Sequence, residues 1–211
     1  MKTQWVAAGL LLVLAACTER REPAESTSGR AQPPPAQPSA STDAAPPASP
    51  PAASIGAMPA AGAIGFHGFG PAPFGSAEEA VRMAWGKELG GMQPDQPGGC
   101  YYLMPQPRSQ QGYRVAFMFE GGTFVRMDVD APDIEAPGGG RVGMQAQDIQ
   151  RLYAGHVQVQ PHKYVEGGQN LRIPNPDGGT GVVLFETDAS GRVTAWRIGE
   201  PPQVDYVEGC S

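Results

Sequence analysis

One arrangement of sequence elements occurs twice between residues 69 and 199, and this repetition constrains the fold more than any other feature. Each unit reads as a glycine-led turn, a helix and three strands, the first over about 69–130 and the second over about 137–199. The aligned positions are Phe74-Gly75-Ser76 with Val142-Gly143-Met144, Val81 with Ile149, Trp85 with Tyr153, and 115–120 with 182–186. The repeat therefore predicts an α+β domain with a tandem duplication, built mainly on antiparallel sheet.

Local signals agree with this division into elements. Ser76 and Glu79 have the spacing of a capping box, and Gly90-Gly91 is expected to end the first helix. A second helix is expected near 146–153, although no good N-cap residue precedes it. Glycine-rich turns between apolar runs predict hairpins at Gly121-Gly122, Gly167-Gly168 and 188–191. A final strand is expected over 203–210.

The distribution of aromatic residues shows which part of the chain folds. Every Phe and Tyr and two of the three Trp lie in 65–211, whereas 18–64 contains no aromatic residue and ten prolines. A segment without large apolar side chains cannot offset the entropy lost when its backbone is ordered. We therefore expect 17–64 to be a disordered tether and 65–211 to be one globular domain of 147 residues.

The first sixteen residues have the features of a signal peptide. Lys2 precedes an uncharged, mostly apolar run that is too short to cross a bilayer as a helix. The run ends in Leu14-Ala15-Ala16-Cys17, which resembles the lipobox of bacterial lipoproteins, and Leu14 fits an ordinary signal peptidase badly. The resemblance implies a signal peptide over 1–16, lipidation of Cys17 and attachment to a membrane through that lipid. Because Thr18 follows the cysteine, the resemblance implies the outer membrane, with the domain in the periplasm.

Two further cysteines, Cys100 and Cys210, are consistent with export. In an oxidising compartment they most simply form one disulfide, which would close a loop of about 110 residues. The alternative is a reactive thiolate at Cys100, paired with His156 or His162. That alternative leaves Cys210 without a role, so the sequence favours the disulfide.

Patterns that could bind a cofactor or a metal lack the context that such sites need. Residues 138–143 match the dinucleotide fingerprint Gly-x-Gly-x-x-Gly, but Pro137 and an acidic loop precede them where a strand is required. The acidic loop carries four carboxylates, which are Asp128, Asp130, Asp133 and Glu135. Their spacing does not match an EF-hand, so only an irregular calcium site is left open. The histidines share no metal-ligand spacing; they are His67, His156 and His162. We expect no cofactor and no metal.

Two functional classes are disfavoured by the sequence. The formal net charge is −6, and the longest basic cluster is Arg20-Arg21 in the tether, so the chain lacks the basic surface that binds nucleic acid. There is no Gly-x-Ser-x-Gly elbow and no Ser-x-x-Lys motif. We therefore expect a protein that is not an enzyme and that has no nucleic-acid partner.

Two resemblances concern the globular part. The turn at Gly143-Met144 and the following helix are similar to the repeat of β-lactamase-inhibitor proteins and of SmpA/OmlA outer-membrane assembly lipoproteins. The runs Pro161-His162-Lys163-Tyr164, Trp196-Arg197 and Val207-Glu208-Gly209-Cys210 resemble small proteobacterial lipoproteins labelled as lectins. The first resemblance implies a protein-binding module and the second a carbohydrate-binding one. Neither supplies a catalytic residue.

These observations predict one general function, ligand recognition, with two possible kinds of ligand. The domain is expected to be a non-enzymatic recognition module that binds either a glycan or an envelope protein or secreted enzyme. Exposed aromatic and polar side chains would make the contact, and Trp85 is assigned to the core because it aligns with Tyr153. The candidate ligand-binding residues are His162, Lys163, Tyr164, Arg172, Trp196 and Arg197.

Overall fold

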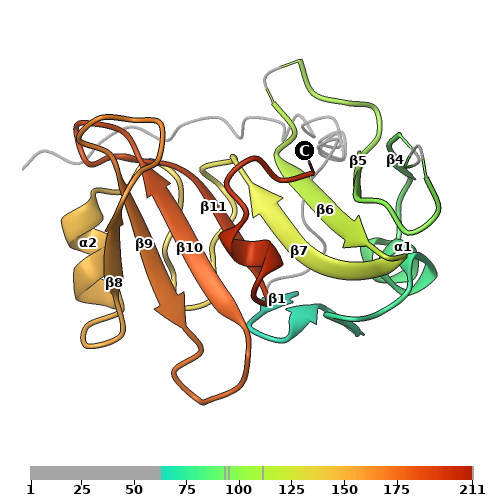
Figure 1. The fold of residues 1–211 in the computed structure, drawn as a ribbon, viewed down its shortest axis with the longest axis horizontal. Coiled ribbons are helices and arrows are strands. Elements are labelled where there is room, and N and C mark those ends of the chain that lie inside the picture. Colours follow the sequence, from blue (N-terminus) through green and yellow to red (C-terminus); the bar gives the residue numbers. More distant parts are fainter. Residues whose placement is uncertain (1–62, 93, 95, 111, 211) are drawn as a thin grey trace, which may run out of the picture. The chain divides into compact units, whose positions relative to one another are not determined.

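An eight-stranded antiparallel sheet dominates the computed structural model, which describes residues 63–92, 94, 96–110 and 112–210 (Figure 1). The strands follow one another across the sheet in the order β4-β5-β6-β7-β11-β10-β9-β8. Their bounds are β4 (Leu89–Gly90), β5 (Tyr101–Pro105), β6 (Val115–Glu120), β7 (Thr123–Val129), β8 (Gln158–Pro161), β9 (Gln169–Pro174), β10 (Val182–Thr187) and β11 (Val193–Gly199). The α+β class with a mainly antiparallel sheet is therefore confirmed.

The two halves of the chain contribute equally to this sheet. Helix α1 (Glu78–Trp85) precedes the four strands β4 to β7, and helix α2 (Ala146–Leu152) precedes the four strands β8 to β11. The halves meet where β7 pairs with β11, from Val129 opposite Trp196 to Arg126 opposite Gly199. Each half thus has one strand more than expected, because a short strand follows each helix.

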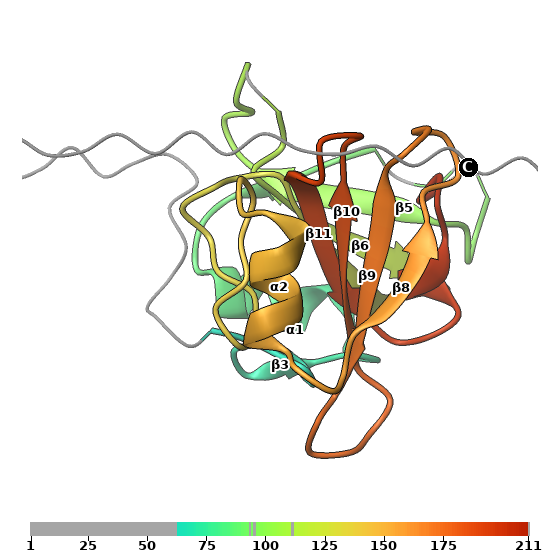
Figure 2. The same cartoon turned by 90° about the vertical axis from the view of Figure 1, so that its left-hand side faces the viewer.

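Both helices cover the same face of the sheet (Figure 2). Side chains alternate between the two faces of a strand, so every second strand residue points toward the helices. These residues and the inner faces of α1 and α2 form one continuous core. Its largest fully buried members are Trp196, Phe69, Phe117, Phe119, Phe124, Phe185, Leu103, Met127, Ile149, Leu171 and Ile173. Trp85 and Tyr153 belong to this core, as expected.

Helix α1 begins and ends differently from the sequence expectation. Its N-cap is Ala77, without a side-chain hydrogen bond, so the capping box of Ser76 and Glu79 is wrong. The reason is tertiary, because the Ser76 carbonyl accepts a hydrogen bond from the Phe124 amide and Ala77 bridges to Thr123. The helix ends at Trp85 because Gly86 adopts a left-handed conformation with φ 69°.

Helix α2 has a cap that the sequence reading missed. Gln145 occupies the N-cap position, and the Asp148 side chain accepts a hydrogen bond from its amide at 3.4 Å. Gln145 also bridges to Arg192, the residue before β11. In both halves the residue before the helix is therefore tied to the last hairpin of its own half.

The expected turns are present, but the expected final strand is not. Gly121-Gly122 joins β6 to β7, Gly167-Gly168 lies between β8 and β9, and 188–191 joins β10 to β11. Residues 203–205 instead form a short 3-10 helix, η1 (Gln203–Asp205), and the rest of 200–210 is irregular. The sheet edges are β4 and β8, and this C-terminal segment crosses the sheet face opposite the helices (Figure 2).

Residues 63–73 add a small sheet that the sequence reading did not anticipate. Its strands are β1 (Ile64–Gly65), β2 (Gly68–Phe69) and β3 (Ala72–Pro73), and Phe69 packs against Trp85 and Phe117. Within the described part of the chain, no helix is long and apolar enough to cross a membrane. The expected signal peptide, Cys17 and almost all of the tether lie outside the described residues.

Candidate ligand-binding pocket

The sheet face opposite the helices is charged, although it belongs to strands that are largely apolar. Strand alternation sends Phe117, Met127 and Ile198 into the core and sends their neighbours to the other face. The side chains on that second face include Tyr102 and Met104 on β5, Ala116 and Met118 on β6, Arg126 and Asp128 on β7, Glu186 on β10, and Ala195 and Arg197 on β11. Buried charges need partners, so the hydrogen bonds on this face decide how it is built.

The first buried pair is formed by Arg126 and Asp128 on β7. The Arg126 Nη2 atom lies 2.6 Å from Asp128 Oδ1, and both side chains are buried. Nη1 of Arg126 donates to the carbonyl oxygens of Gln203 at 3.0 Å and Tyr206 at 2.7 Å. Burial by itself would lower the pKa of Arg126, but the Asp128 carboxylate outweighs it and raises that pKa. Arg126 therefore stays charged and anchors the C-terminal segment.

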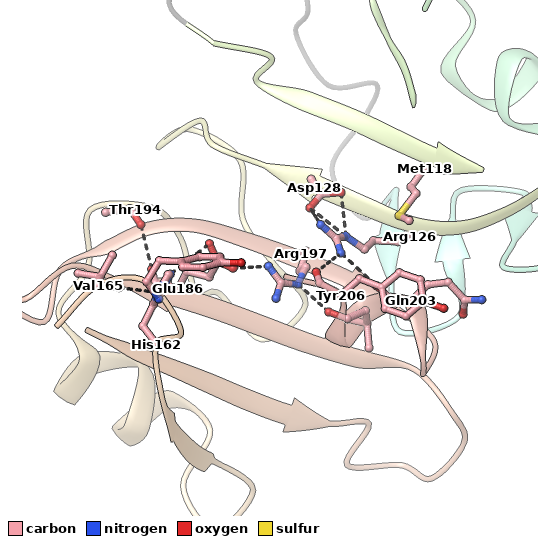
Figure 3. Close-up of polar contacts among 12 residues, drawn as sticks. Met118, Arg126, Asp128, His162, Val165, Glu186, Thr194, Arg197, Gln203 and Tyr206 are labelled. Atoms are coloured by element: carbon pink, nitrogen blue, oxygen red, sulfur yellow. Dashed lines mark hydrogen bonds and ion pairs between the residues drawn. The ribbon is translucent and has the colours of Figure 1, made fainter. Parts of the chain in front are cut away.

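The second buried pair is formed by Arg197 on β11 and Glu186 on β10. Arg197 is 4% exposed; its Nη1 donates to Glu186, and its Nε donates to the Val204 carbonyl at 2.6 Å. Its Nη2 atom is buried and has no hydrogen-bond partner within the described part of the protein. Figure 3 shows the two arginine–carboxylate pairs beside Gln203 and Tyr206 of the C-terminal segment.

His162 lies at the end of this row of charges. Its Nδ1 atom accepts hydrogen bonds from the amides of Tyr164 and Val165, both at 3.1 Å. The ring proton of neutral His162 must therefore sit on Nε2, which lies 3.9 Å from Glu186 Oε2 (Figure 3). The loop that follows β8 is thus held against the charged face.

Residues 200–210 form the C-terminal segment, which is fastened to the charged face at both ends. Near its start, Val204 packs on Val182 and Leu184, and Arg172 pairs with Asp205 at 3.0 Å. At its end, Cys210 forms a disulfide with Cys100, with 5.3 Å between the two Cα atoms. The disulfide expected from the sequence is confirmed. A reactive thiolate at Cys100 is wrong, because the sulfur is already bonded.

A cavity of about 240 Å³ lies between the charged face and the C-terminal segment. Its walls are formed by residues of five strands or their connections and by 207–209; they are Tyr102, Met104, Tyr113, Ala116, Arg126, Asp128, Glu186, Ala195, Trp196, Arg197, Val207, Glu208 and Gly209. Gly209 has φ 68°, and a Cβ there would lie 2.7 Å from the Tyr102 hydroxyl. Only glycine fits this close approach without strain.

Two tyrosines supply hydroxyl groups to this pocket. Burial raises the pKa of Tyr102 above its usual value, and the Asp128 carboxylate adds to the effect. Burial also raises the pKa of Tyr113, again with Asp128 as the next cause. Both phenols therefore stay protonated at neutral pH. The Tyr102 hydroxyl donates to Met118 Sδ at 3.6 Å and keeps its oxygen as an acceptor, whereas the Tyr113 hydroxyl can donate to a ligand.

Five of the six residues proposed from the sequence place their side chains around this pocket or its C-terminal wall. Arg197 lines the pocket, His162 faces Glu186, and Arg172 binds Asp205. Lys163 Nζ lies 2.7 Å from Glu208 Oε1, and Tyr164, which is 62% exposed, donates its hydroxyl to the same carboxylate. The hydrogen bond from Lys163 lowers the pKa of Glu208.

Trp196 is the exception among the six. Its side chain is 1% exposed and belongs to the core, where its ring packs against Phe185. The expectation that Trp196 is an exposed contact is therefore wrong. The reason is strand parity, because Trp196 and its pairing partner Val129 both face the helices while Arg197 faces the pocket.

The other candidate sites have structural explanations. In the fingerprint-like run 138–143, Gly140 packs against Phe185, and the Tyr153 hydroxyl bonds Pro137 and Gly140. The carboxylates of the acidic loop already have partners; Asp128 pairs with Arg126, Asp130 with the Tyr113 amide, Asp133 with Arg114 and Glu135 with Arg141. Among the described residues, no group of His, Cys, Asp and Glu side chains is arranged to hold a metal.

Sequence reasoning missed most of the residues that line the pocket. Tyr102, Tyr113, Arg126 and Glu186 were not among the candidate ligand-binding residues, and Asp128 was considered only as part of a calcium site. The sequence does contain a pattern that indicates this charged face, because Arg126-x-Asp128 places two charges at alternate positions of an otherwise apolar strand. Such a pattern indicates a sheet with one apolar and one polar face.

Comparisons with known proteins add little to this description. No family model matches the chain, and no curated protein matches it. The chain is similar to an extracellular protein containing a SCP domain from Bacillus anthracis str. Ames, at 13% identity and TM-score 0.42, over 60% of this chain and 44% of that one. It is also similar to the uncharacterized protein yfeY from Escherichia coli, at 16% identity and TM-score 0.42, over 65% of this chain and 98% of that one. The chain thus spans less than half of the first structure, and at these scores neither likeness bears on function.

Proposed function

We propose that this domain is a non-enzymatic recognition module that binds carbohydrate in the pocket between the sheet and the C-terminal segment. The observation that carries the proposal is the pocket itself. It combines the hydroxyl groups of Tyr102 and Tyr113 with the charged groups of Arg197 and Glu186. Sugar hydroxyls both donate and accept hydrogen bonds, and this set offers donors and acceptors within one small space.

The size and position of the pocket also favour a sugar. Ligand pockets for drug-sized molecules are roughly 300–1,000 Å³, and about 240 Å³ is enough only for a smaller ligand such as one sugar ring. Tyr164 and Lys163 contact Glu208, which is part of the pocket wall. A glycan chain leaving the pocket would therefore meet an exposed aromatic ring at the rim.

Removal of one pocket hydroxyl tests the proposal without deleting a buried ring. Tyr113→Phe and Tyr102→Phe are each expected to weaken glycan binding by about 1 kcal/mol, roughly fivefold, because a neutral hydrogen bond to the ligand is lost. Binding of a panel of mono- and disaccharides is measured by isothermal titration calorimetry. Tyr206→Phe is the matched control, because Tyr206 does not line this pocket. Equal binding by all three variants and the unchanged protein would contradict the proposal.

We also propose that the protein is lipid-anchored at the outer membrane through Cys17, as the lipobox resemblance implies. Cys17→Ser is expected to abolish lipidation and to leave the precursor uncleaved, because Leu14 suits an ordinary signal peptidase badly. Metabolic labelling with palmitate, followed by membrane fractionation, is the measurement. Cys100→Ser is the control and should still be labelled. A protein that carries no label before any substitution would refute the anchor.

A protein partner is the second candidate function, and one observation favours it. Strand β8 is an edge of the sheet, all four of its residues are exposed, and Val159 is 51% exposed. An exposed strand edge can pair with an extended segment of another protein. Crosslinking in intact envelopes separates the two functions, since a protein partner would be recovered in the presence of excess free sugar.

The arrangement of the sheet supports a proposal about origin. We infer that the two halves arose by tandem duplication of one helix-and-four-strand unit. The support is the matching order of elements and the pair of equivalent bridges, Ala77 to Thr123 and Gln145 to Arg192. The pocket lies across the junction of the halves, since Asp128 and Arg197 are paired residues of β7 and β11.

A further inference from the structure

Among the described residues, no strand pairs with the outer edge of β8, the last strand of the sheet (Figure 2). The opposite edge strand, β4, has only two residues, and a short edge gives a partner little to pair with. Longer edges are usually protected by charged side chains or by proline. Residues 157–161 read Val-Gln-Val-Gln-Pro and contain no charged residue, so Pro161 at the end of β8 is the one such protection. The outer edge of β8 is therefore open to another strand.

The register between β8 and β9 shows which backbone groups point to this open edge. The His162 amide donates to the Gly168 carbonyl, and hydrogen-bonded pairs alternate along two antiparallel strands. Every second residue before His162 in the same register therefore points its amide and carbonyl toward β9. The backbone groups of Val157, Val159 and Pro161 point outward instead, and proline supplies only a carbonyl. The open edge thus offers the amides of the two valines and the carbonyls of all three residues.

The two faces of β8 differ in chemistry. Val159 lies opposite Leu171, a core residue, so its side chain is on the face that the helices cover, where it is 51% exposed. Gln158 and Gln160 point to the other face. There the side-chain oxygen of Gln158 accepts a hydrogen bond from Arg172 at 3.3 Å, and its side-chain nitrogen can donate to a neighbouring strand. A strand that pairs here therefore needs apolar side chains on one face and hydrogen-bonding side chains on the other.

A second copy of β8 meets these requirements when it runs antiparallel to the first, with a two-fold axis at Val159. Val159 then lies opposite its own copy and exchanges two backbone hydrogen bonds with it. On each side of the axis, the Val157 amide of one copy donates to the Pro161 carbonyl of the other. Gln158 lies opposite Gln160 of the other copy, where the two side-chain amides can bond each other. Valine thus meets valine, glutamine meets glutamine, and no charge faces a like charge.

We propose that the protein forms a symmetric dimer in which the β8 strands of two copies pair edge to edge. The two sheets then join into one, with the helices of both copies on the same face, because the paired Val159 side chains share a face. A strand pair of this length buries little surface, so the dimer is weak and its amount depends on concentration. This inference goes beyond the proposed sugar function and names one partner for the exposed edge described there.

Sedimentation velocity of the purified full-length chain over a series of concentrations measures the association. We expect a shift from monomer to dimer, without larger species. Val159→Lys places two lysines opposite each other across the axis and should weaken the dimer by about tenfold or more, because like charges in a strand pair repel each other. Met83→Lys is the matched control, since Met83 is 71% exposed but lies on α1, and it should leave the association unchanged. A chain that stays monomeric up to about 1 mM would overturn the inference.

A charge exchange at Val159 tests the position of the axis. Val159→Glu alone should weaken the dimer as Val159→Lys does, whereas an equimolar mixture of the two variants should associate again, because opposite charges then face each other. Thermal melting confirms that both variants are folded. A mixture that fails to associate, while the unchanged chain dimerises, would overturn the assignment to β8. Crosslinking of a different protein at β8 without any dimer would also overturn it, but would leave the second candidate function standing. Sugar binding is measured separately, so neither result bears on the pocket.

Discussion

Replacing both Cys100 and Cys210 with serine is expected to lower the free energy of unfolding by about 4–5 kcal/mol. The disulfide closes a loop of 110 residues, and loop-closure entropy for a loop of this length is of that size. The loss should appear in the C-terminal segment first, because Cys210 fastens its end to β5. The segment should keep its contacts at Arg126 and Arg197, so the sheet itself is expected to remain folded.

Urea denaturation followed by circular dichroism measures this effect. Adding reductant should shift the midpoint of the unchanged protein toward that of the double variant and should leave the double variant where it is. Thiol counting on the denatured, unreduced domain should detect no free thiol. Two reactive thiols, or a double variant as stable as the unchanged protein, would show that the bridge does not form.

Trp196→Ala is expected to lower the free energy of unfolding by about 3–5 kcal/mol, because truncating a buried aromatic side chain leaves a cavity. Trp196 is fully buried and packs against Phe185 at the centre of the sheet. Tyr164→Ala is the matched comparison. Its ring is exposed, so stability should change by less than about 1 kcal/mol, while glycan binding should weaken if the ligand extends over the rim.

One denaturation curve and one binding titration for each variant separate these outcomes. A small loss of stability for Trp196→Ala would mean that the indole is not in the core, contrary to the strand parity described above. A large loss for Tyr164→Ala would mean that the ring holds the β8–β9 loop in place through Glu208, and it would remove Tyr164 from the list of ligand contacts.

Local sequence patterns were sufficient for the two helices, the longer strands of the sheet and the disulfide. Gly121-Gly122 joins two strands because both glycines adopt positive φ, a conformation that sequence composition alone suggests. The Cys100–Cys210 bridge followed from the number of cysteines and the expectation of export. Fold class, the helices and most strands are likewise local properties, since they depend on the spacing of apolar residues along one segment.

The tertiary structure decided which groups make the site. The strand expected over 203–210 does not form, because the carbonyl oxygens of Gln203, Val204 and Tyr206 accept hydrogen bonds from Arg126 and Arg197. Trp196 and Arg197 are neighbours in sequence, yet one lies in the core and the other lines the pocket. The sequence determined that successive side chains of each strand point to opposite faces of the sheet. Only the packing of the two helices on one face determined which of these faces lines the pocket. That choice depends on contacts between segments far apart in the chain, which no local pattern records.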